Sequence, residues 1–283
     1  MFTSTSRLLS GVLLAGSLFV LAGCDKGNDP QDAATVTASA EDQSVAEDEN
    51  AAMGDLVEAA SPADITVAGS PAAEPTDLVR LAGSCFTRTF DAATRTLTLD
   101  FGPVNCVGPN GVARRGKIVA VFSGPYRQAG ATTTITLVDY YRNDNHHTGT
   151  RTITNLGGGS WDLSVQGASV TTPAGTHTWT SQRKYTRTAG SATRTVLDDT
   201  YSVTGQASGT NRRGVSYTAT IDQPLIKKFQ LGCARTFVAG TLSITNSKEK
   251  TMLLNYDPTG TQACDNLASV TVNGKTWTIR CGR

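Results

Sequence analysis

A polar–apolar alternation in residues 78–283 is the sequence feature that most constrains the fold. Residues 94–101, 134–138 and 215–221 place apolar side chains at alternating positions, with threonine prominent between them. A period of two is typical of a β-strand with one buried and one exposed face. Because β-branched threonine suits a pleated surface, these residues are expected to form half-buried strands.

Turn sequences separate the strands along the chain. Asn110-Gly111, residues 211–214 and residues 258–260 are built from residue types that favour tight turns. This spacing suits an up-and-down meander, and the segment is long enough for one sizeable core. We predict an all-β domain over residues 78–283, a large antiparallel meander that forms a curved sheet, a half-barrel or a sandwich.

The dipeptide Asn273-Gly274 predicts the geometry of the last hairpin. As the two central residues of a type I′ turn, it sets the register of the flanking strands and places four apolar side chains on one face. The pairs expected to face each other are Val270 with Trp277 and Ala268 with Ile279.

The first residues are typical of an export signal. Arg7 precedes an apolar run over residues 8–21, which is too short for a membrane-spanning helix. The run ends in Leu21-Ala22-Gly23-Cys24, the pattern at which bacterial lipoproteins are cleaved. We expect residues 1–23 to be a signal peptide and Cys24 to carry a lipid that anchors the protein in the outer membrane, facing the periplasm or the cell surface.

The lipid-bearing segment, residues 24–77, is expected to be a disordered tether. It contains no aromatic residue and holds thirteen Asp or Glu against one Lys, a net charge of −12. Low hydrophobicity and high charge are typical of disordered chains. Residues 78–283 hold 23 Lys or Arg and 11 Asp or Glu, a net charge of +12, so the two parts have opposite charge.

A basic domain indicates an anionic partner. Its charge attracts polyanions such as an acidic glycan or a phosphate-bearing lipid, and aromatic side chains beside cations bind sugars. No specific nucleic acid is expected. Two alternatives remain open: arginines that only line solvated strand faces, and a tether that lies against the domain and competes with the ligand. The candidate binding residues are Trp179, which is expected to be exposed, with Arg183, Lys184, Arg187, Arg212 and Arg213.

Five cysteines remain after Cys24 is lipidated. In an oxidising compartment this number predicts two disulfides and one free thiol, and spacing alone leaves the pairing open. A weak internal repeat favours one bridge within each repeated unit. The favoured bridges are Cys85–Cys106 and Cys233–Cys264, with Cys281 left reduced.

Several motifs resemble those of an uncharacterised family of β-rich bacterial lipoproteins. They are Leu99-Asp100-Phe101-Gly102 before Cys106, Arg115-Gly116-Lys117-Ile118, the long stretch over residues 197–217, and Asn273-Gly274-Lys275. The resemblance implies a lipid-anchored, β-rich envelope protein. It brings no catalytic residues to this chain.

No catalytic, metal-binding or cofactor motif stands out. His146 and His147 share an expected loop with Asp144, where an exposed polar turn is favoured over a metal site because adjacent strand residues point to opposite faces. The neighbours Asp198 and Asp199 match the separated carboxylates of glycosidases poorly, and turn capping is expected instead. We therefore expect a non-enzymatic binding or structural module. The alternatives are a hydrolase of envelope or extracellular polymers and a lipid carrier with an apolar half-barrel.

Overall fold

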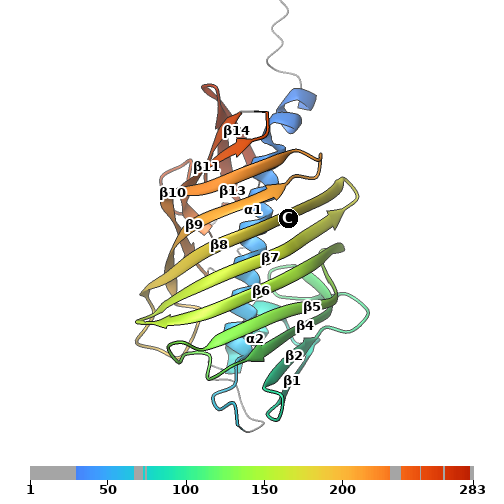
Figure 1. Ribbon diagram of the computed structural model, residues 1–283, viewed down its shortest axis with the longest axis vertical. Coiled ribbons are helices and arrows are strands. Elements are labelled where there is room, and N and C mark those ends of the chain that lie inside the picture. The colour runs from blue at the N-terminus through green and yellow to red at the C-terminus, as the bar shows by residue number, and fades with distance from the viewer. Residues whose placement is uncertain are drawn as a thin grey trace, which may run out of the picture.

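A computed structural model describes residues 30–66, 73, 75–229, 237–248, 250–263 and 265–280. Its architecture is one open antiparallel sheet that curves around a long helix (Figure 1). Apart from the short β3, which pairs only with β4, each strand is hydrogen-bonded to the next one along the chain, from β1 at one edge to β14 at the other. The predicted fold class, a large antiparallel meander, is confirmed, and the curved single sheet is the form it takes.

Within the described residues, the sheet contains fourteen strands and is accompanied by two helices. The strands are β1 (Thr87–Asp91), β2 (Thr96–Asp100), β3 (Cys106–Val107), β4 (Ala113–Phe122), β5 (Thr132–Arg142), β6 (Asn145–Gly157), β7 (Ser160–Thr172), β8 (Gly175–Ala189), β9 (Thr200–Thr210), β10 (Ser216–Lys228), β11 (Phe237–Asn246), β12 (Thr251–Asn255), β13 (Leu267–Val272) and β14 (Lys275–Arg280). The helices are α1 (Pro30–Ala60) and α2 (Pro75–Ala82).

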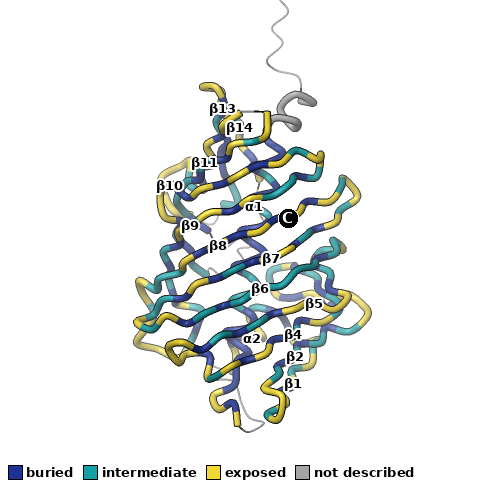
Figure 2. The backbone as a smooth tube through the Cα atoms, in the orientation of Figure 1, coloured by how far each residue is buried: buried dark blue, intermediate teal, exposed yellow. Residues whose placement is uncertain are grey.

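Alternation along each strand separates an outer, polar face from an inner, buried one. In β8, Thr178, Thr180 and Gln182 are exposed, whereas the intervening Trp179 and Arg183 are buried. Figure 2 shows the same alternation of buried and exposed residues in the neighbouring strands. The threonines that identified the strands therefore lie mainly on the outer face, where their hydroxyls contact water.

The last hairpin has the register that its turn sequence predicts. Asn273 and Gly274 both have positive φ, as a type I′ turn requires. The prediction of two facing apolar pairs is confirmed. These pairs are Val270 with Trp277 and Ala268 with Ile279.

One predicted disulfide is present among the described residues. Cys85 and Cys106 are bonded, with their Cα atoms 5.5 Å apart, and the bridge joins the segment before β1 to β3. By closing a loop, such a bridge stabilises the fold by roughly 3 kcal/mol. The cysteines predicted for the second bridge, the predicted free thiol and the lipidation site lie outside the described residues; they are Cys233, Cys264, Cys281 and Cys24.

α1 fills the concave side of the sheet. It runs across the strands, and Figure 1 shows it behind β5 to β9. Almost every described side chain from position 37 onward is at least partly buried, and Met53, Leu56 and Val57 belong to the main apolar core. The prediction of a disordered tether is therefore wrong for Pro30–Ala60, which forms a helix inside the domain.

The sheet supplies the partners that a polar helix lacks by itself. α1 is rich in Ala, Glu and Gln, which favour helix, but its apolar residues form no continuous face that an isolated helix would need. On the inner face of the sheet, basic side chains meet its carboxylates. The ion pairs are Arg212 with Glu41 and Asp42, Arg183 with Glu47, Arg142 with Glu49, Lys227 with Asp55, and Arg127 with Glu58.

One alternative was that the acidic segment lies against the basic domain and competes with a ligand. The ion pairs confirm the contact, and the competition stays a prediction. The pair between Glu47 and Arg183 is the most deeply buried, with both side chains at most 1% exposed. Arg183 Nε lies 3.1 Å from each carboxylate oxygen of Glu47. Such a pair depends on both partners, because one charge alone in the interior is costly.

We expect Glu47→Gln to lower the free energy of unfolding by about 3 kcal/mol, because it leaves the Arg183 guanidinium uncompensated. Adding Arg183→Met should recover part of that loss. Chemical denaturation of the single and double variants measures both effects. Asp162→Asn on the exposed outer face is the matched control and should change little. Additive losses in the double variant would show that the pair does not interact.

Candidate ligand-binding pocket

The six residues predicted to bind a ligand do not form one exposed surface. Trp179 is 2% exposed and stacks on His177, with the ring centroids 4.9 Å apart. Arg183 points inward to Glu47, whereas its neighbour Lys184 is exposed on the outer face. The prediction of an exposed Trp179 is wrong because its position in β8 places it on the inner side.

The remaining three predicted binding residues also lie apart. Arg187 is half-buried at the end of β8, where its Nη1 lies 3.5 Å from both carboxylate oxygens of Asp199. Arg212 is bound by the carboxylates of α1, and Arg213 is exposed in the turn between β9 and β10. Much of the basic charge predicted to attract a polyanion is therefore used within the chain.

The two histidines predicted to lie in an exposed polar turn, His146 and His147, are instead on opposite faces of the sheet. His147 is 3% exposed on the inner face, while His146 faces the other way and packs on Tyr141, with the ring centroids 4.8 Å apart. Asp144 pairs with Arg115 instead of a histidine. Among the described residues, no group of three or more His, Cys, Asp or Glu has the arrangement to hold a metal ion.

A small pocket with a cavity volume of about 40 Å³ lies between the second half of α1 and the inner face of the sheet. This volume is room for about three water molecules and is below the range for sites that enclose a drug-sized ligand. The helix supplies one wall and β6 to β10, with the loop after β4, supply the other. The lining residues are Asn50, Ala51, Gly54, Asp55, Glu58, Tyr126, Ile153, Trp161, Leu163, Tyr185, Tyr201 and Lys227.

Aromatic rings form the sheet side of the pocket. Trp161 and Tyr201 meet edge to face with centroids 5.7 Å apart, and Tyr185 packs on Tyr201 at 6.3 Å in the same manner. Lys227 Nζ lies 4.7 Å from the centroid of the Tyr201 ring. Rings fixed against one another in this way present a rigid apolar wall.

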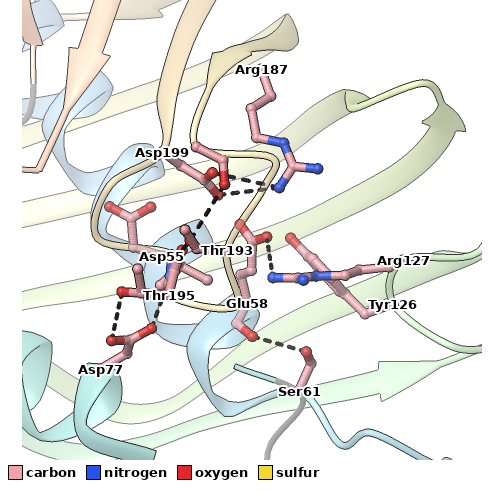
Figure 3. A network of polar contacts seen from close by, with 12 residues as sticks. Asp55, Glu58, Ser61, Asp77, Tyr126, Arg127, Arg187, Thr193, Thr195 and Asp199 are labelled. Carbon is pink, nitrogen blue, oxygen red and sulfur yellow. Dashed lines mark hydrogen bonds and ion pairs between the residues drawn. The ribbon is translucent and has the colours of Figure 1, made fainter. Parts of the chain in front are cut away.

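Ion pairs frame the same pocket. Asp55 is paired with Lys227, and Glu58 Oε1 lies 3.5 Å from Arg127 Nη2. The Tyr201 hydroxyl lies 3.0 Å from Asp199 Oδ2 and 3.3 Å from Glu58 Oε2, so two carboxyl groups converge on one phenol. Figure 3 shows Glu58 facing Arg127, with the Asp199–Arg187 pair nearby. Each acidic group thus has a basic neighbour.

Burial changes the proton affinity of these groups. It raises the pKa of Glu58, although Arg127 and Lys227 oppose the shift. Burial likewise raises the pKa of Asp199 and that of Tyr201, so the Tyr201 hydroxyl keeps its proton and donates. Perturbed carboxyl groups beside a pocket are a common property of ligand-binding and catalytic sites.

α2 fixes the loop that carries Asp199. The Asp77 carboxylate accepts a hydrogen bond of 2.9 Å from the Thr195 hydroxyl and one of 2.8 Å from the Val196 backbone N–H. Figure 3 shows Asp77 below this loop. The loop therefore holds Asp199 against Tyr201, at the edge of the pocket.

Besides Glu58 Oε1, which has only its ion pair with Arg127, three residues of the lining carry buried polar atoms without a hydrogen-bond partner among the described residues. They are the side-chain amide of Asn50, the indole N–H of Trp161 and the hydroxyl of Tyr185. An unsatisfied buried polar group costs about 1–3 kcal/mol. A ligand that hydrogen-bonds to these groups recovers that free energy.

Gly54 leaves open space where α1 faces the pocket. A Cβ built on it meets no atom within 4 Å. Glycine inside a helix costs up to about 1 kcal/mol relative to alanine. Its position therefore keeps the helix side of the pocket open.

No protein-family model, curated protein sequence or solved structure matches the chain. Within the described part of the chain, no helix is long and apolar enough to cross a membrane. The site must accordingly be interpreted from its own geometry.

The sequence patterns did not indicate the helix side of the pocket. Asn50, Gly54, Asp55 and Glu58 all lie in the segment predicted to be disordered. The available signal was the matched charge of −12 and +12, together with the helix-forming composition around these residues. That signal indicates a contact between the two parts but not where a pocket forms.

We expect Gly54→Ala to raise the free energy of unfolding by about 0.5–1 kcal/mol, since it improves helix propensity and meets open space. Thermal or chemical denaturation measures the change. A lower stability would show that the pocket wall is closed at this position.

We expect Glu58→Gln to change the pH dependence of stability. The raised pKa means that the folded protein binds the proton more tightly than the unfolded chain does. The wild-type protein therefore loses stability relative to the variant as pH rises from about 4.5 through the folded-state pKa. Denaturation at a series of pH values measures the difference, and a constant difference would contradict the shift.

Proposed function

We propose that this chain is a non-enzymatic binding module of the bacterial cell envelope, and that it holds a small neutral ligand in the pocket between α1 and the sheet. The observation that carries the proposal is the coincidence of three features at one place. The pocket has aromatic walls, its lining residues carry polar atoms without partners, and an interior helix glycine leaves space beside it.

The chemistry of the lining favours a neutral, hydroxyl-bearing ligand such as a sugar, and the cavity of about 40 Å³ accepts one edge of a sugar ring and not the whole ring. The rings of Trp161 and Tyr201 offer apolar faces, while Asn50 and Tyr185 offer hydrogen bonds to hydroxyl groups. The carboxylates already have basic partners, so the site has little excess charge to neutralise on a ligand. A neutral pyranose combines apolar C–H faces with several hydroxyl groups, which this lining matches.

The proposed location of the protein rests on its N-terminal signal sequence. Lipidation of Cys24 would hold the module at the outer membrane, where glycans are abundant. The cleavage pattern Leu21-Ala22-Gly23-Cys24 supports this part of the proposal, as do the motifs that resemble those of the bacterial lipoprotein family. A polyanionic ligand is less well supported, because two of the predicted binding arginines, Arg183 and Arg212, are already paired with carboxylates of α1.

A sugar hydrolase is the second candidate, and Glu58 is the observation that favours it. Its carboxyl lines the pocket and has a raised pKa, as a general acid requires. Asp199 also has a raised pKa but is not among the lining residues, and both carboxyls lie at the same Tyr201 hydroxyl. Glycosidases place two carboxyls on either side of the scissile bond, so binding is favoured over hydrolysis.

We expect titration of the purified protein with neutral monosaccharides and their phenyl glycosides to give a saturable change in tryptophan fluorescence, reported by Trp161. Gly54→Leu should abolish the response, because its side chain fills the pocket from the helix side. Lys184→Met on the exposed outer face is the matched control and should bind as the wild type does.

The outcomes separate the candidates. Absence of a saturable response, or an equal response in Gly54→Leu with its fold intact by circular dichroism, would contradict the pocket as the site. Release of the phenol from a phenyl glycoside, lost in Glu58→Gln, would replace the binding proposal with the hydrolase.

A further inference from the structure

A second cluster of charged residues lies on the inner face, outside the pocket. Arg114 of β4, Arg142 of β5 and Arg151 of β6 are all buried and surround Glu49 of α1. Arg151 is 1% exposed, Arg114 4% and Arg142 9%. None of these four residues lines the pocket described above.

Glu49 is the negatively charged member of this group. Its Oε2 lies 3.4 Å from Arg142 Nη1, and its Oε1 lies 3.4 Å from His147 Nδ1. Although burial acts to raise it, the surrounding cations hold the pKa of Glu49 below its usual value, so the carboxylate is charged. Burial lowers the pKa of His147 to about 4, which leaves that ring neutral near pH 7.

The guanidinium groups are incompletely satisfied. All three nitrogens of Arg151 lack a hydrogen-bond acceptor among the described residues, as do Nε and Nη1 of Arg114 and Nε of Arg142. The centroid of the Trp179 ring lies 6.0 Å from Arg151 Cζ. Three positive charges thus share one carboxylate in the interior.

Such an excess of buried positive charge requires compensation. Arginine does not lose its proton under ordinary conditions, and an uncompensated charge in the interior costs several kcal/mol. A small anion between the guanidinium groups supplies both the missing charge and the missing hydrogen-bond acceptor.

We propose that Arg114, Arg142 and Arg151 bind one monovalent inorganic anion of halide size, such as chloride, on the inner face of the sheet beside Glu49. The enclosure by α1 and the strands favours a monatomic ion over a larger oxyanion. The Glu49 carboxylate disfavours a divalent one, because like charges at this range repel strongly in the interior.

The test is thermal unfolding of the full chain at constant ionic strength, with gluconate replaced stepwise by chloride, bromide or phosphate. We expect chloride and bromide to raise the midpoint saturably by about 2–4 °C, a shift typical of ligand binding to a domain of this size. Phosphate should give no saturable rise. A saturable rise with phosphate alone, or an equal response to all anions, would overturn the proposal.

Arg151→Met separates an anion site from a structural role. In gluconate the variant should be at least as stable as the wild type, because it removes an uncompensated charge, and its response to chloride should be lost. Lys184→Met on the outer face should retain the full response. Equal destabilisation of Arg151→Met in every anion would show that Arg151 acts only as a structural residue.

Bromide diffraction gives a readout that needs no variant. A crystal of the wild-type protein grown in bromide should show an anomalous peak within hydrogen-bond distance of Arg151 and at least one of the other two arginines. If bromide peaks are present on the protein surface but absent at these arginines, the proposal is overturned.

Discussion

The contact between the acidic helix α1 and the basic inner face of the sheet is the interaction on which the rest of the structure depends. The open, curved sheet has a concave side that must be filled, and the helix that fills it is polar. Ion pairs such as Glu47–Arg183 compensate charges that neither the helix nor the sheet satisfies alone. Because burying such charges is costly, the two parts must be ordered together, and apolar residues of α1 such as Met53 and Leu56 complete the shared core.

Both proposed sites lie where α1 and the inner face of the sheet do not fully match each other in shape or in charge. Near the C-terminal half of α1, Gly54 and the aromatic wall leave a space, and the charges there are nearly balanced. Near its middle, the sheet offers three arginines and the helix one carboxylate at Glu49, so positive charge is in excess. The first mismatch is one of volume and suits a small neutral group, such as the edge of a sugar. The second is one of charge and suits a small anion. The two sites therefore select different ligands for different physical reasons.

Sequence patterns predicted the strands and the final turn, because these depend on neighbouring residues. Thr134–Ile135 and similar alternations specify which face of a strand is buried, and Asn273-Gly274 fixes a register within a few residues. The sequence failed for α1, since a helix without a continuous apolar face has the composition of a disordered chain. It also failed for Trp179 and His147, whose burial depends on a helix that covers the inner face of the sheet.

By itself, then, the sequence determined the all-β meander, the register of its last hairpin and the opposite charges of its two parts, and it favoured the Cys85–Cys106 bridge without fixing the pairing. Only the tertiary structure decided where those charges meet, which arginines are neutralised, and that Glu58 lies beside Tyr201 across a separation of 143 residues. The physical reason is that strand periodicity and turn geometry are local properties of the chain. Charge compensation and the shape of a pocket depend on the three-dimensional path that brings distant residues together.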